Sequence, residues 1–453
     1  MDGEHGEMFM VSGRMVGMKR PGRWWRRWAF PRGLVVFSVF IVGFQACMTA
    51  GRSASDRETQ EAEARGAERR LDASTPLPHP PMPDALDAAR SFLGTRPLYE
   101  QPLAVGMTIP SGLNALDAKS CGTCHAEIYA EWSVSTHALA WRDPQFQAEI
   151  TKSGNRWLCL NCHTPLMVQH DTWPVGLNEG DIDRPRLIAN PLFDASLREE
   201  GITCAGCHVR EGVIHGPGLE QSTAPHPVVK DPAFRSEALC LRCHQAEATY
   251  PGKSYACTFA TGKEWRSGPY AAKGQTCAFC HMPSVRRSVA PGAPVRSTRR
   301  HWWRGAGIPK IEGIQPPLEA NPPGLGVEAS WRGEALVVDL VNARAGHKLP
   351  TGDPERWIQV DVQFLTGTGQ AIGDKRSIRI GQKWEWYPVA KKLSDNRLAP
   401  LEHRERVFIA PPGARKALVV ASSHRMSPET ADYHHLKDYP IGIETHRFEV
   451  PRQ

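Results

Sequence analysis

The chain has 453 residues, which is enough for two or three domains, and its net charge is +7. Its 40 glycines and 38 prolines predict much irregular backbone and few long helices, and they exclude a coiled coil. Seven of the basic residues lie among the first 32, so the rest is nearly neutral and we do not expect nucleic acid as a partner.

Residues 1–47 have the pattern of an export signal. Basic residues from Lys19 to Arg32 precede an apolar run over residues 34–44, which is too short to span a bilayer comfortably and fits the hydrophobic part of a signal peptide. Cys47 then follows Ala46, where a bacterial lipoprotein signal places its lipidated cysteine. Because Phe44 and Gln45 depart from the usual motif, a lipoprotein, an uncleaved anchor and plain secretion all stay open.

Residues 48–92 are expected to form a disordered tether. The segment is rich in Ser, Glu, Arg, Ala and Pro, and it cannot bury enough apolar surface to fold alone. A short helix is expected at its end, around residues 84–93. The tether either holds the following domain off a membrane or is simply a solvated N-terminal segment.

Residues 93–312 contain ten of the twelve cysteines, in five copies of Cys-x-x-Cys-His. The copies are Cys121, Cys124 and His125; Cys159, Cys162 and His163; Cys204, Cys207 and His208; Cys240, Cys243 and His244; and Cys277, Cys280 and His281. Two thiols three positions apart can each add to one vinyl group of a porphyrin, and the next residue then reaches the iron. Zinc sites and disulfides give no reason for a histidine after every pair. We therefore expect five covalently bound haem c groups, with the five histidines as proximal iron ligands.

The spacing of these motifs predicts the fold of this domain. They are separated by 38, 45, 36 and 37 residues, which leaves room for one or two helical turns and a loop each. We expect a mostly irregular and α-helical domain in which the porphyrins themselves form the core.

Residues 320–453 change in character. Short, alternating, β-branched segments such as 335–341, 357–364 and 417–420 are separated by turn residues. Six or seven such strands predict an all-β, immunoglobulin-like antiparallel sandwich. A proline-rich stretch over residues 315–324 marks the boundary, so the chain is expected to be multidomain.

Five further motifs carry a resemblance to a known family. They lie at residues 131–138, 159–166, 201–208, 264–267 with 277–283, and 346–352. Together they resemble the multihaem cytochromes related to the tetrahaem electron acceptor of hydroxylamine oxidoreductase, of the c-552 and c-554 type, over roughly residues 113–365. The resemblance implies that most irons have two histidine ligands and that His137 is a distal ligand. That family also includes reductases with one open iron, although the Cys-x-x-Cys-Lys site of the ammonia-forming nitrite reductases is absent from this sequence.

Eleven histidines remain for the distal positions when the proximal five and the N-terminal His5 and His79 are set aside. The candidates, in order, are His137, His301, His226, His347 and His215, with His170 behind them. Each could instead be exposed or bound to a propionate. His347 lies in a Gly-His-Lys-Leu-Pro-Thr-Gly loop of the expected sandwich, which would make the sandwich a lid over one iron. Cys257 is left over, and we expect a buried free thiol.

Two classes of function follow. The first is electron transfer by five low-spin haems in a periplasmic or membrane-associated respiratory chain, with redox proteins such as a quinol-side donor or other cytochromes as partners. The second is an oxidoreductase of a small nitrogen or sulfur compound, which needs one open iron. The spare histidines favour electron transfer over an enzyme. We expect an exported, periplasmic protein anchored to a membrane by lipid or by its N-terminus, with an outer-membrane or cell-surface lipoprotein as one form.

Overall fold

The computed structural model describes residues 82–104, 108–152, 156–218, 224–250, 252–253, 256–317 and 322–452. The chain divides into two units, Met1–Ala64 and Arg65–Gln453, and all described residues belong to the second. The expected signal, Cys47 and most of the tether lie outside the described residues, as does the side chain of Cys257. Within those ranges, no helix combines the length and the apolar character needed to cross a membrane.

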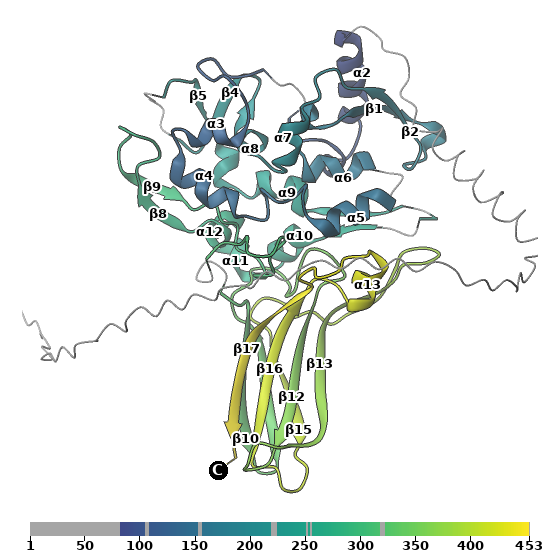
Figure 1. Ribbon diagram of the computed structural model, residues 1–453, viewed down its shortest axis with the longest axis vertical. Helices are drawn as coiled ribbons and strands as arrows, with labels where there is room; N and C mark the ends of the chain where they lie inside the picture. Colours follow the sequence, from purple (N-terminus) through teal and green to yellow (C-terminus); the bar gives the residue numbers. More distant parts are fainter. Residues whose placement is uncertain are drawn as a thin grey trace, which may run out of the picture. The chain divides into compact units, whose positions relative to one another are not determined.

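Residues 82–317, here called the motif region, contain short helices joined by irregular segments (Figure 1). The α-helices are α2 (Met82–Gly94), α3 (Ala118–Gly122), α4 (Ala126–Ser133), α5 (Pro144–Lys152), α6 (Arg156–His163), α7 (Ala195–Glu199), α8 (Cys204–His208), α9 (Ala238–His244), α10 (Thr261–Arg266), α11 (Pro269–Ala272) and α12 (Cys277–His281). Four of them contain whole Cys-x-x-Cys-His motifs. A helix suits this motif because residues three apart lie on one face, which brings the two thiols together.

The first motif begins on a capped helix. Asp117 caps α3 by accepting a hydrogen bond from the backbone nitrogen of Ser120 at 2.8 Å. An acidic cap satisfies one of the amide groups that the first turn leaves unpaired. The cap therefore fixes the backbone at Ser120, which directly precedes Cys121.

Helix α2 starts inside the segment assigned to the tether. Its residues Ala85, Ala89 and Leu93 are four apart and buried, and they pack in one cluster with Trp157 and Trp173. A repeat of four places all three on one helical face. The short helix expected around residues 84–93 is thus present as α2, and it gains its stability from tertiary packing.

The motif region also contains small antiparallel pairs and a three-stranded sheet. The strands are β1 (Thr172–Leu177) with β2 (Pro185–Ala189); β3 (Val209–Arg210), β4 (Val213–Gly216) and β5 (Val228–Lys230); β6 (Ala246–Thr249) with β7 (Ala256–Phe259); and β8 (Ser284–Arg287) with β9 (Arg296–Arg299). The hairpin β8–β9 follows the fifth motif directly.

Residues 322–452, here called the β domain, contain two antiparallel sheets. One has the order β10 (Leu325–Arg332), β11 (Ala335–Asn342), β15 (His403–Ile409). The other has the order β14 (Lys391–Asp395), β13 (Ala371–Glu385), β12 (Trp357–Leu365), β16 (Lys416–His424), β17 (Gly442–Pro451). A short helix, α13 (Pro428–Tyr433), lies between β16 and β17.

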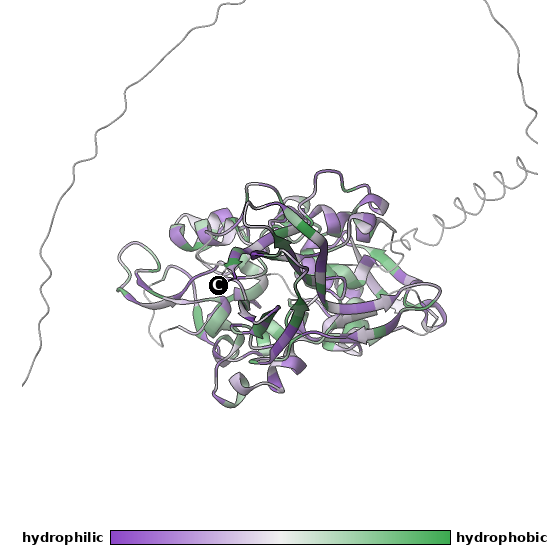
Figure 2. Ribbon diagram, turned by 90° about the horizontal axis from the view of Figure 1, so that it is seen from below, coloured by the Kyte–Doolittle hydropathy of each residue, from purple (hydrophilic) through white to green (hydrophobic). Residues whose placement is uncertain are grey.

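The two sheets share one apolar core. Leu336 and Leu340 of β11 cluster with Val360 and Phe364 of β12 and with Val419 of β16, all with almost no exposure to solvent. Along β12 and the second half of β11, buried residues alternate with partly exposed ones. Figure 2 shows both hydrophobic and hydrophilic stretches on the ribbon, seen from below. Alternation with a period of two puts one face of each sheet into the core.

The motif region and the β domain are joined by buried polar contacts. The Tyr439 hydroxyl donates to Asp143 at 2.6 Å, and the Arg425 guanidinium donates to the carbonyl of Ile308 at 2.7 Å. Arg397 and Glu264 form an ion pair at 2.7 Å with both side chains buried. These contacts join the β domain to α10, to the residue before α5 and to the segment that follows β9 in the motif region.

Candidate functional site

The ten motif cysteines are all free thiols. Within each motif the two thiols come from neighbouring turns of the same short segment, and no disulfide links any of the ten. Free paired thiols are what covalent attachment to two vinyl groups requires, whereas disulfides would consume them.

Most motif histidines have one ring nitrogen fixed by a backbone carbonyl. Four donate from Nδ1: His125 to Val289 at 2.8 Å, His163 to Ala140 at 2.9 Å, His208 to His215 at 2.7 Å, and His281 to Arg304 at 2.6 Å. Donation from Nδ1 fixes the tautomer that leaves Nε2 as a lone-pair donor. Each of these rings is therefore prepared to bind a metal through Nε2.

Two of the candidate distal histidines show the same arrangement. Nδ1 of His301 lies 3.0 Å from the carbonyl of Arg299, and Nδ1 of His347 lies 2.9 Å from the carbonyl of Lys348. Nδ1 of His137 and Nδ1 of His226 are buried and have no hydrogen-bond partner.

The structure brings four candidate distal histidines opposite four motif histidines. The ring centroids are 6.5 Å apart for His125 and His226, 6.3 Å for His244 and His137, 6.4 Å for His208 and His301, and 6.2 Å for His281 and His347. The two histidines of each pair are far apart in the sequence, yet all four centroid distances fall within a narrow range.

This range matches two imidazoles on opposite sides of one metal ion. A nitrogen–metal bond of about 2.0 Å plus about 1.1 Å from nitrogen to ring centre gives a separation of about 6.2 Å. Direct stacking would bring the rings much closer, as for Trp357 and His424 at 4.5 Å. The four pairs therefore fit haem iron with two axial histidines.

Burial keeps several of the motif and candidate distal imidazoles neutral. It lowers the pKa of His137 to about 3, and it lowers the pKa of His163, His244, His301 and His347 to about 4. Neutral imidazole is the form that ligates a metal. At neutral pH these rings need no deprotonation before they bind iron.

Two buried arginine nitrogens beside the motifs also lack partners. They are Nε of Arg242, which lies within the fourth motif, and Nε of Arg304, whose carbonyl accepts from His281. A buried N–H without an acceptor is costly. The carboxylate side chains of a haem are suitable acceptors, so these atoms also fit the group that the motifs predict.

His163 differs from the other motif histidines. Its ring stacks on Phe146 with centroids 3.7 Å apart and planes 4° from parallel. Among the residues that the structure describes, no histidine ring faces it at the distance of the four pairs. The charged side chains Lys310 and Asp143 are close enough to influence its pKa. The histidine of the second motif therefore has surroundings that differ from those of the other motif histidines.

The remaining candidate, His215, lies elsewhere. Its Nδ1 is 3.1 Å from the carboxylate of Asp231, and its contribution to the third motif is its backbone carbonyl, which accepts from His208. His170 directs Nε2 to the carbonyl of Thr164 at 2.8 Å, so that nitrogen is already used. His424 likewise has Nε2 on Ser422.

Contacts between thiols show which motifs are neighbours. Cys121 lies within hydrogen-bonding reach of Cys204, Cys243 of Cys162, and Cys240 of Cys277. Burial raises the pKa of Cys207 to about 11, and the Cys243 thiolate contributes to the increase. The first motif thus lies beside the third, and the fourth lies beside both the second and the fifth; the third and fourth are close enough for Cys243 to influence the pKa of Cys207.

The comparisons with known proteins agree with this geometry. Residues 120–179 match the family described as cytochrome c554 and c-prime. The fold is similar to a penta-haem cytochrome c552 from Thermochromatium tepidum, with a TM-score of 0.54 and 18% identity over 76% of this chain and 100% of that chain. A hypothetical protein from Pyrococcus horikoshii OT3 matches with a TM-score of only 0.14 and 12% identity, over 28% of this chain and 87% of that chain. No curated protein matches. Together, the family match and the fold support a multihaem c-type cytochrome with covalently bound haem.

Proposed function

We propose that the chain is a pentahaem electron-transfer cytochrome of a respiratory chain. The four histidine pairs with centroids 6.2–6.5 Å apart carry this proposal. Haem iron with two axial histidines is low-spin and supplies one-electron transfer without an open position for substrate. The name of the Thermochromatium tepidum protein supports the number five.

The residues that would hold the five groups are those already named. The ten motif cysteines attach them, and His125, His163, His208, His244 and His281 ligate from the proximal side. His226, His301, His137 and His347 are the distal ligands for the first, third, fourth and fifth motifs, in that order. The protein sets the potentials through burial of the imidazoles and through the carbonyls that bond Nδ1.

The adjacency of the motifs supports a continuous route for electrons. The first motif contacts the third, the fourth contacts the second and the fifth, and the third and fourth are close enough for their thiols to interact electrostatically. A redox partner at either end could exchange electrons with the whole series. The direction of electron flow depends on the reduction potentials of the redox partners relative to those of the haems.

A second candidate function is reaction with a small nitrogen or sulfur compound at the second motif. The observation in its favour is that, among the described residues, no histidine ring lies opposite His163 at the distance of the four pairs; Phe146 stacks on the face of the His163 ring and does not lie opposite its Nε2. An iron with one protein ligand could bind a small molecule, and Lys310 and Asp143 could supply charge and protons nearby.

Spectroscopy of the purified holoprotein tests both functions. Mass spectrometry should show five haem additions, and magnetic circular dichroism should show four low-spin bis-histidine haems and one with a different ligand set. Fewer than five additions would contradict the pentahaem proposal. Four low-spin haems plus a fifth that binds carbon monoxide would support the second function at the second motif, whereas a fifth that is low-spin and inert would exclude it.

We also propose export and membrane attachment through residues 1–47, and an immunoglobulin-like assignment for the β domain. The basic and apolar pattern before Cys47 supports attachment. The substitution Cys47→Ser should abolish lipid attachment and release the protein from membranes. Unchanged processing and membrane retention would contradict the lipoprotein form.

A further inference from the structure

Hydrogen bonds within the β domain hold the loop that carries His347. Asn342, which is fully buried, donates from Nδ2 to the carbonyls of His347 at 2.8 Å and Leu398 at 3.1 Å. Leu349 and Leu398 also exchange two backbone hydrogen bonds. The loop therefore moves only together with the segment around Leu398.

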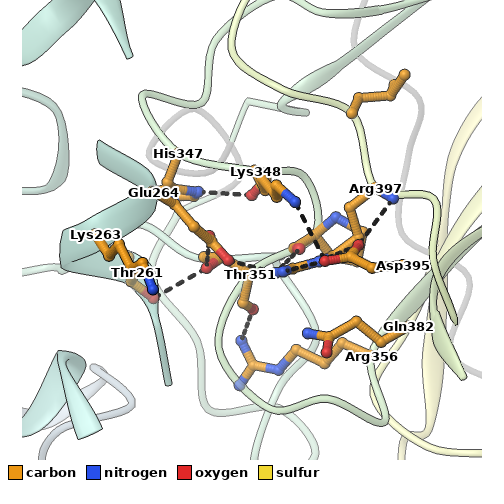
Figure 3. A network of polar contacts seen from close by, with 12 residues as sticks. Thr261, Lys263, Glu264, His347, Lys348, Thr351, Arg356, Gln382, Asp395 and Arg397 are labelled. Carbon is orange, nitrogen blue, oxygen red and sulfur yellow. Dashed lines mark hydrogen bonds and ion pairs between the residues drawn. The ribbon is translucent and has the colours of Figure 1, made fainter. Parts of the chain in front are cut away.

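A buried ion network ties that segment to the motif region (Figure 3). The guanidinium of Arg397 donates to Oε1 of Glu264 at 2.7 Å and, through Nε and Nη2, to both oxygens of Asp395 at 2.9 Å. Glu264 and Arg397 are 7% and 8% exposed. A planar guanidinium that meets one carboxylate with two parallel bonds and a second carboxylate with a third bond fixes the orientation of all three groups.

The network holds the residues that follow His347. Lys348, the next residue, forms an ion pair with Asp395 at 3.2 Å, and Thr351 donates to Oε2 of Glu264 at 2.6 Å. Arg397 also donates to the carbonyl of Pro350 at 3.2 Å. The loop is thus held at three positions after His347.

Glu264 is in turn fixed to the fifth motif. It lies on α10, whose next residue Trp265 donates from its indole nitrogen to the carbonyl of Gln275 at 3.0 Å. Gln275 is two residues before Cys277. One side of the network therefore leads to the attachment site of the fifth haem, and the other leads to the ring that faces His281.

We infer that Arg397 is a positioning residue, which uses Glu264 and Asp395 to hold His347 of the β domain as distal ligand of the fifth haem. The inference rests on the proposed function, because it requires His347 to ligate iron. It makes the β domain part of one haem site rather than an appendage, and it assigns a function to buried charges that lie away from the iron.

The test uses the full holoprotein with the substitutions His347→Ala, Arg397→Gln and Glu264→Gln. We expect His347→Ala to convert one haem per chain to a high-spin form that binds carbon monoxide. Arg397→Gln and Glu264→Gln should open part of that same haem, so that the double variant Arg397→Gln/His347→Ala binds no more carbon monoxide than His347→Ala alone. Arg397→Lys, which keeps the charge but not the fork of donors, should restore less than full low-spin character.

The control is Arg332→Gln, which removes an exposed ion pair with Glu405 in the same domain and should leave the spectrum unchanged. If His347→Ala left the haems as they were, the proposed ligation would be wrong. If His347→Ala opened one haem while Arg397→Gln and Glu264→Gln opened none, only the positioning role would be wrong. If Arg397→Gln opened more haems than His347→Ala does, the network would support the fold in general, which would also overturn the inference.

Discussion

The bond made by Nδ1 separates two kinds of buried histidine in this chain. His301 bonds a carbonyl through Nδ1 and keeps Nε2 free, whereas His170 uses Nε2 on the carbonyl of Thr164. Both rings are buried, and burial lowers the pKa of both to about 4. His301 and His170 are therefore alike in burial and in their lowered pKa, and only a free Nε2 distinguishes the ligand from the other histidine.

This difference predicts opposite outcomes for two alanine substitutions. His301→Ala should leave one haem per chain high-spin and able to bind carbon monoxide, because the partner of His208 is lost. His170→Ala should leave all haem spectra unchanged and lower the free energy of unfolding by about 1–3 kcal/mol, because a buried carbonyl loses its donor. Electronic spectra and urea unfolding of the two variants check the pair of predictions, and a new high-spin haem in His170→Ala would contradict the criterion.

How far the sequence predicts the site also depends on single residues. The motif spacing alone identifies Cys121 or His281, because covalent chemistry imposes a fixed order of residues. It cannot identify carbonyls such as that of Val289, which bonds His125, because any residue provides one. His215 has the sequence context of a ligand, and only the fold shows that its contact with the third motif is made by its backbone carbonyl, which accepts from His208.

At the scale of elements, helix α4 and the hairpin β8–β9 are joined through one buried carboxylate. Glu131 accepts from both terminal nitrogens of Arg287, at 2.6 and 3.0 Å, and from the backbone nitrogen of His301 at 2.9 Å. Glu127, one turn earlier, meets the same arginine at 3.4 Å but is exposed. The two carboxylates form a matched pair that differs in burial.

Glu131→Ala should destabilise the protein by about 3–5 kcal/mol, because it leaves the buried Arg287 without its partner. Glu127→Gln should cost at most about 1 kcal/mol, since an exposed ion pair is screened by water. Urea unfolding followed by far-ultraviolet circular dichroism measures both values. Similar losses for the two variants would show that the contact of Glu131 is not the dominant one.

The elements themselves were predictable to different degrees. Alternation along residues 335–341 and 357–364 predicts strands, and the structure has β11 and β12 there. The pairing order is not visible in that pattern, because β15 joins β11 across more than sixty residues. The small sheets of the motif region are too short for periodicity to reveal, whereas the helix expected around residues 84–93 is present as α2, which packs on Trp157 and Trp173.

For the whole molecule, the junction between the motif region and the β domain depends on buried charge. Asp143 lies between α4 and α5, and it binds Lys310 and the hydroxyl of Tyr439. Burial by itself would raise the pKa of Asp143, but the Lys310 ammonium and the Tyr439 hydroxyl outweigh it and lower the pKa. The folded protein thus holds this carboxylate in its charged form.

A lowered pKa gives the contribution of Asp143 a defined dependence on pH. An unfolded aspartate titrates near about 3.9, so the stabilisation is fully present above that pH. It is lost as the pH falls through the lower pKa of the folded state.

We expect the unfolding midpoint of the holoprotein in urea to fall between pH 5 and pH 3, values chosen to bracket about 3.9. Asp143→Asn should be less stable than the natural chain at pH 7 and should approach it at acid pH, whereas the exposed Asp87→Asn should follow the natural chain throughout. If the difference for Asp143→Asn stayed constant with pH, the charge of Asp143 would not stabilise the junction.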